Sequence, residues 1–156
     1  MNFELEFELD VPDLTWTQAE RVAAACTGPQ MLAVTTGPRR RWFRPRPPTL
    51  WISQYDADGR HLLADDADDA DWDQPAWKMN PQVIPLLART IQTLCRQLPQ
   101  GFVLRAASID DSVHADRERD VSCQELLGIV RASAMNPRVG YRVPAQTQNS
   151  DTKASS

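Results

Sequence analysis

Residues 2–9 read Asn2-Phe3-Glu4-Leu5-Glu6-Phe7-Glu8-Leu9, and this stretch decides the fold. Apolar and acidic side chains alternate along it with a period of two, which predicts a strand with one buried and one solvated face. A half-buried strand belongs to an antiparallel or mixed sheet, because the strands of parallel sheets are buried on both faces. The three glutamates also discourage edge-to-edge aggregation.

Three helices are predicted in the sequence that follows this strand. The first begins at a capping box of Thr17 and Glu20, or one turn earlier at Thr15 and Gln18. The second opens at Asn80-Pro81 and carries a long apolar stripe up to Leu98. Pro85 would break a hydrogen bond inside that helix, so its regular part is expected to begin nearer residues 82–83.

The third helix follows a capping box of Ser122 and Glu125 and ends before Asn136-Pro137. Six further strands are expected at residues 30–35, 49–55, 60–63, 101–109, 117–121 and 139–143. Because hairpin connections outnumber helical crossovers, this order predicts an α+β fold. We expect a mainly antiparallel sheet of about five to seven strands with three helices packed on one face.

Composition indicates one α+β domain over residues 1–143, because 156 residues with 42% hydrophobic and 24% charged side chains can bury an ordinary core. Residues 144–156 are polar and are predicted to be a disordered tail. No apolar run approaches the roughly 20 residues of a membrane span, and the acidic N-terminus is unlike a signal peptide. We therefore expect a cytoplasmic protein that does not enter membranes.

The three cysteines, at positions 26, 95 and 123, are far apart and odd in number. They form no CxxC pair, so the spacing indicates neither a zinc site nor a disulfide framework. We expect buried, reduced thiols, since each cysteine falls in a predicted helix.

An acidic segment, residues 56–73, holds eight aspartates against the single Arg60. It lacks a calcium-binding loop, since position twelve counted from Asp56 is Ala67, and we expect no metal and no cofactor. Unpaired carboxylates are too costly to bury, so the segment must stay solvated, fold over the arginines of its own chain, or face a basic partner. The predicted partner-binding residues, here named the Asp/Trp strip, are Asp65, Asp66, Asp68, Asp69, Asp71, Trp72, Asp73 and Trp77.

An arginine segment, residues 39–46, carries five arginines and no acid. Arginines interleaved with aromatic side chains suit single-stranded nucleic acid, which needs phosphate contacts and stacking surfaces. Three nearby prolines favour an extended chain, so the alternative is a stiff connection between two strands, and the net charge of −4 argues against nucleic-acid binding by the whole molecule. The nucleic-acid candidates are Arg39, Arg40, Arg41, Trp42, Phe43, Arg44 and Arg46.

Catalytic signatures are sparse. The two histidines, His61 and His114, fall beside a turn and in a polar loop, where nothing predicts the desolvation that tunes a catalytic pKa. No nucleophile elbow, phosphate-binding loop or zinc-protease motif is present, so we assign no catalytic residue. A divalent-metal-dependent or His-assisted hydrolase is kept as an alternative.

The second half of the chain resembles a group of small uncharacterised bacterial α+β proteins, some of which are similar to immunity proteins. The resemblance is carried by Asp71-Trp72-Asp73-Gln74-Pro75-Ala76-Trp77, the 87–98 helix, Gly101-Phe102, the Ser122 cap and Tyr141-Arg142-Val143. It implies a non-enzymatic protein that blocks a basic partner, such as a toxin or a nucleic-acid enzyme. The sequence leaves the oligomeric state open.

Overall fold

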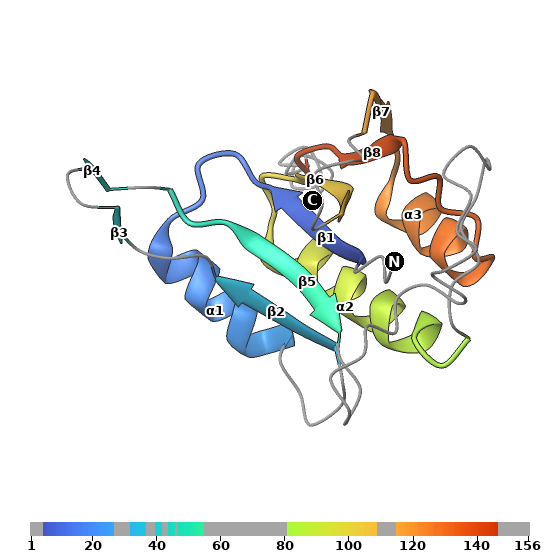
Figure 1. Ribbon diagram of the computed structural model, residues 1–156, viewed down its shortest axis with the longest axis horizontal. Coiled ribbons are helices and arrows are strands. Elements are labelled where there is room, and N and C mark those ends of the chain that lie inside the picture. Colours follow the sequence, from blue (N-terminus) through green and yellow to red (C-terminus); the bar gives the residue numbers. More distant parts are fainter. Residues whose placement is uncertain are drawn as a thin grey trace, which may run out of the picture.

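The computed structural model describes residues 5–26, 32–36, 40–41, 44–45, 47–54, 81–108 and 115–146. Helices and strands follow one another along the chain in the order shown in Figure 1. Their bounds are β1 (Leu5–Asp10), α1 (Trp16–Cys26), β2 (Leu32–Thr36), β3 (Arg40–Arg41), β4 (Arg44–Pro45), β5 (Leu50–Gln54), α2 (Ile84–Gln97), β6 (Phe102–Ser108), β7 (Arg117–Asp120), α3 (Cys123–Arg131) and β8 (Val139–Val143).

The sheet has six strands in the order β2-β5-β1-β6-β8-β7. Every neighbouring pair is antiparallel except β7 and β8, which run parallel. The predicted α+β class with a mainly antiparallel sheet is confirmed. The return strand expected at residues 60–63 lies outside the described residues.

Strand β1 lies inside the sheet and pairs with β5 on one side and β6 on the other. Phe7 is opposite Ile52 and Ala106 in the register, and its side chain is fully buried. Leu9 is opposite Leu50 and Leu104 and is 2% exposed. Strand β1 is therefore not an edge of the sheet, contrary to the protective role that the sequence suggested for its glutamates.

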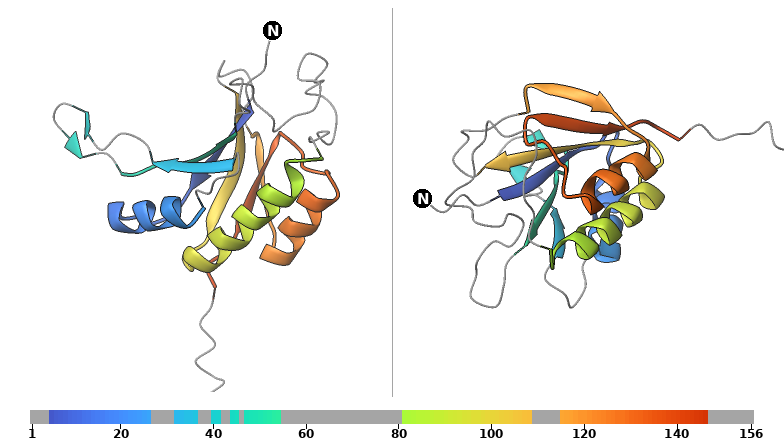
Figure 2. Two further views of the ribbon diagram at one scale, coloured as in Figure 1. Left: turned by 90° about the horizontal axis from the view of Figure 1, so that it is seen from below. Right: turned by 90° about the vertical axis from the view of Figure 1, so that its right-hand side faces the viewer.

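The three helices lie on the same side of the sheet in Figure 2. In α2 the predicted apolar stripe is buried, including Leu87, Ile91 and Leu94, which have no exposed surface. The strands supply the facing half of the core with Phe102, Leu104 and their neighbours. The opposite face of the sheet carries charged side chains such as Arg105 and Arg142 together with Trp51 and Val103.

The helix starts follow local hydrogen-bonding chemistry. The Gln18 amide N–H donates to Thr15 Oγ1 over 3.1 Å, and the Glu125 N–H donates to Ser122 Oγ over 3.0 Å. These contacts confirm the alternative cap of α1 and the predicted cap of α3. Helix α2 begins at Ile84 behind Val83, within two residues of the regular start that Pro85 led us to expect, and Pro85 lies in the first turn, where a missing N–H breaks no helical bond.

The end of the described chain is hydrogen-bonded to α2 and to the residues that follow this helix. The Gln146 amide N–H donates to the Pro99 carbonyl oxygen over 2.9 Å, and its side-chain amide donates to the Cys95 carbonyl oxygen over 3.1 Å. The predicted tail begins at residue 144, whereas the described chain continues, hydrogen-bonded, to Gln146. Residues 147–156 lie outside the described residues.

A disulfide joins Cys95 in α2 to Cys123 at the start of α3. The expectation of three reduced thiols was therefore wrong, because the sheet brings together two helices whose cysteines are 28 residues apart in sequence. Cys26 is free and half-buried, and burial raises its pKa to about 11. No described helix is long and apolar enough to cross a membrane.

Removing the bridge should destabilise the fold. Closing a loop of 28 residues restricts the unfolded chain, so Cys95→Ser with Cys123→Ser should lower the free energy of unfolding by about 3.5 kcal/mol. Urea unfolding measures this loss, with Cys26→Ser as the control that leaves the bridge intact. Alkylation of the unfolded protein should add one label before reduction and three after it. Three labels without reductant would contradict the bridge.

Candidate functional site

The structure describes only the residues on either side of the acidic candidates that the sequence identified. The Asp/Trp strip falls within residues 55–80, outside the described residues. Its chain leaves the sheet at Gln54, the last residue of β5, and returns to the described fold at residue 81, just before α2. His61 and His114 also lie outside the described residues.

The arginine segment contains a short antiparallel ribbon. Arg40 is opposite Pro45 and Arg41 is opposite Arg44 in the β3–β4 pair. The described part of the segment, residues 40–41 and 44–45, is paired strand and not helix, as expected. Figure 1 shows β3 and β4 set apart from the six-stranded sheet, beyond one end of β2 and β5.

Arg41 and Arg44 are register partners in this strand pair. The sequence identified the charge of the segment, but the pairing of these two residues depends on the register of β3 and β4.

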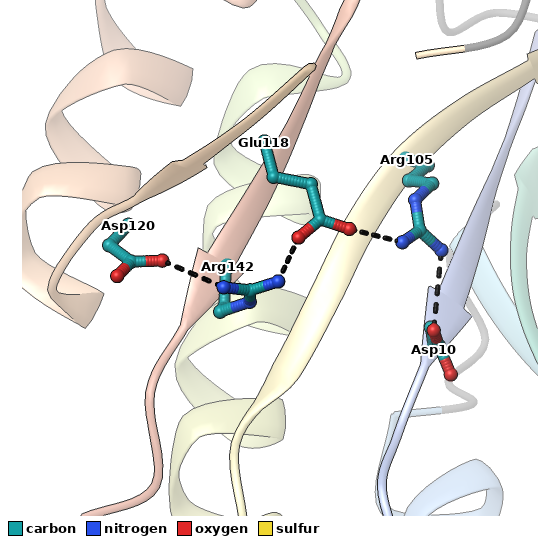
Figure 3. Close-up of polar contacts among 5 residues, drawn as sticks. All are labelled: Asp10, Arg105, Glu118, Asp120 and Arg142. Atoms are coloured by element: carbon teal, nitrogen blue, oxygen red, sulfur yellow. Dashed lines mark hydrogen bonds and ion pairs between the residues drawn. The ribbon is translucent and has the colours of Figure 1, made fainter. Parts of the chain in front are cut away.

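A network of five charged side chains crosses the open face of the sheet (Figure 3). Arg105 of β6 contacts Asp10 of β1 at 3.4 Å and Glu118 of β7 at 2.5 Å. Arg142 of β8 contacts the other carboxylate oxygen of Glu118, and it reaches Asp120 at 3.5 Å. Glu118 is therefore shared between two guanidinium groups, and the network ties edge strand β7 to three other strands.

Gly140 gives the side chain of Arg105 room to reach Glu118. It lies opposite Glu118 in the β7–β8 register. A Cβ atom at this position would stand 3.3 Å from Cγ of Arg105 and 3.3 Å from Cγ1 of Val103. Without that atom, the side chain of Arg105 crosses β8 to Glu118, a close approach of the kind that glycine in a strand often serves.

Two arginines offset two of the three carboxylates of the network within the molecule. Burial lowers the pKa of Arg105, but hydrogen bonds to Glu118 and Asp10 outweigh it, so this pKa lies above its ordinary value. The cation and its carboxylates thus stabilise one another. Such an arrangement positions the strands that carry these side chains.

The remaining described surface offers little for chemistry. A hollow of about 220 Å³ at the ends of β1, β6 and β8 has a mostly apolar lining, with Asp10 and Arg142 as its charged members. Both of these already belong to the ion-pair network. Among the described residues, no group of three or more His, Cys, Asp or Glu side chains could hold a metal ion.

The ion-pair network was missed by sequence reasoning. The outward positions of β6 and β8 predict that Arg105 and Arg142 face solvent, but their partners on β1 and β7 are far away in sequence. Only the sheet order brings these four strands together. No protein-family model, curated protein or solved structure matches the chain, so its function is inferred from its own residues.

Replacing the shared carboxylate should weaken the edge of the sheet. Glu118→Gln removes charge from both arginine contacts, so we expect the free energy of unfolding to fall by about 1 kcal/mol at low salt and by less in 1 M salt. Asp120→Asn is the matched control, because that carboxylate is 66% exposed and makes one contact of 3.5 Å. Urea unfolding at both salt concentrations measures the difference. Equal losses for the two variants would show that Glu118 has no special place in the network.

Proposed function

We propose that this chain is a non-enzymatic binding protein of the immunity type that blocks a basic partner through its Asp/Trp strip. The observation that carries the proposal is the concentration of charge: eight aspartates in residues 56–73, next to Trp72 and Trp77. Carboxylates at this density steer a basic partner during encounter, and aromatic side chains supply contact area after it docks.

The acidic residues that the structure describes differ from those of the acidic segment, and the difference supports this assignment. Asp10, Glu118 and Asp120 are engaged by Arg105 and Arg142 of the same molecule. The two guanidinium groups offset two of these three negative charges on the open face of the sheet. The acidic segment has only Arg60 within its own sequence, so it is the larger source of negative potential in the chain.

The compartment in which the protein can act depends on the redox state of Cys95 and Cys123. A cytoplasmic inhibitor would have to keep Cys95 and Cys123 reduced, whereas the disulfide between them favours an oxidising compartment. We therefore propose a partner that is met outside the reducing cytoplasm.

A second candidate function rests on the arginine hairpin. Arg41 facing Arg44, with Trp42 and Phe43 between them in sequence, favours a nucleic-acid-associated module. Its signature is affinity for a single-stranded oligonucleotide that falls steeply with salt and is lost in Arg40→Ala with Arg41→Ala.

Neutralising the strip tests the proposed function. Affinity capture from the source organism, under oxidising conditions, identifies the partner with the wild-type protein as bait. Replacing Asp65, Asp66, Asp68 and Asp69 by Asn should then slow association with that partner by at least about tenfold at low salt and flatten its salt dependence, since steering scales with charge. A double variant within the strip, Asp68→Asn with Asp69→Asn, is compared with a control double variant, Asp13→Asn with Asp116→Asn. The control makes the same charge change at exposed sites elsewhere. Equal kinetics for wild type and the four-site variant would remove the strip from the binding site.

A further inference from the structure

One row of side chains crosses the open face of the sheet, and the register of the strands defines it. Thr35 of β2 is opposite Trp51 of β5, and Trp51 is opposite Glu8 of β1. On its other side, Glu8 is opposite Arg105 of β6. Trp51 and Glu8 lie on the open face because the residues before and after each of them belong to the buried core. The row therefore places an indole next to a carboxylate.

The carboxylate of Glu8 is not used by the arginine opposite it. The guanidinium group of Arg105 contacts Asp10 at 3.4 Å and Glu118 at 2.5 Å instead, as Figure 3 shows. Glu8 is half-exposed, and its carboxylate has no ion pair or hydrogen bond among the described residues. With Glu8 included, the open face holds four described carboxylates, the others being Asp10, Glu118 and Asp120, against two guanidinium groups, which leaves a net charge of −2.

The indole of Trp51 is also without a partner among the described side chains. It is half-exposed and makes no hydrogen bond or ring contact with them. Its neighbours Thr35 and Ser53 are too small to cover the ring. Aromatic side chains with a polar N–H are enriched at protein interfaces. Residues directly opposite in an antiparallel pair have Cβ atoms roughly 4.5–5.5 Å apart, so a group bound to Glu8 is within reach of the ring.

We propose that Trp51 and Glu8 form a binding site for an arginine side chain of a protein partner. A guanidinium group donates two parallel hydrogen bonds to a carboxylate, and its planar face stacks on an indole. The pair offers both contacts, and the net negative charge of the open face attracts the cation. An ammonium group lacks the planar face and the fork of donors, so lysine fits this site less well.

This site goes beyond the proposed function, because it contains no residue of the Asp/Trp strip. Its chemistry depends only on side chains of β1 and β5 and does not require the strip to bind anything. If the partner of the strip is basic, as proposed, the open face gives that partner a second point of contact.

A peptide titration tests the site in the absence of any partner. The probe is a blocked Gly-Arg-Gly peptide, added at low salt to the isotope-labelled full chain and followed by two-dimensional proton–nitrogen NMR. The Trp51 indole signal is assigned by its loss in Trp51→Leu. Saturable shifts should centre on this indole and on the amides around Glu8. A peptide with citrulline, a neutral isostere of arginine, should cause no saturable shift, and a lysine peptide should bind at least about threefold more weakly.

Two substitutions separate the contribution of the charge from that of the ring. Glu8→Gln keeps the shape of the side chain and should raise the dissociation constant of the arginine peptide at least about tenfold, because the charge-assisted hydrogen bonds are lost. Trp51→Leu, followed through the backbone amides, should raise it about threefold. Asp13→Asn is the control, since it removes one negative charge at an exposed site outside the sheet and should bind the peptide like wild type.

Three results would each overturn the proposal: no saturable shift at Trp51 in the wild-type protein, equal affinity for the arginine and citrulline peptides, or an unchanged dissociation constant in Glu8→Gln. Equal affinity for the lysine and arginine peptides would overturn the assignment to arginine, because the contact would then depend on charge alone. The Asp/Trp strip is intact in every variant, so failure of this site and failure of the strip are told apart.

Discussion

Pairing of β1 on both sides, with one face buried, is the constraint on which the rest of the molecule depends. Phe7 and Leu9 point into the core, and each lies opposite apolar residues of both β5 and β6. A slip of one residue would turn these side chains to solvent and bring Glu8 into the core. Losing one large buried aromatic side chain costs about 3–5 kcal/mol, a large share of an ordinary domain's stability of about 5–15 kcal/mol.

The register of β1 also determines which charged side chains meet on the open face and which strands form the edges of the sheet. Fixing β1 against β6 places Asp10 within reach of Arg105, and β8 then carries Gly140 between Arg105 and Glu118. Fixing β1 against β5 sets β2 at the opposite edge. Thr36 and Gln54, which the two charged segments follow in sequence, consequently lie at opposite ends of the β2–β5 pair.

Most elements of the fold could be predicted from local patterns. The alternation around Phe7, the apolar stripe of α2 and the Ser122 cap depend on neighbours within a few residues. The sequence missed features that depend on distant neighbours: the parallel β7–β8 pair, the Cys95–Cys123 bridge and the ion-pair network. Charge counting identified the acidic and arginine segments, but the opposition of Arg41 and Arg44 required the hairpin register.

Native-state hydrogen exchange tests the central place of β1 most directly. An interior strand opens only when the whole domain unfolds, whereas edges open locally. The amides of Phe7 to Leu9 should therefore exchange among the slowest in the protein, with free energies near that of global unfolding, and those of β3 and β4 should exchange much faster. Equal exchange rates in β1 and in the hairpin would contradict the interior position of β1 and every arrangement derived from it.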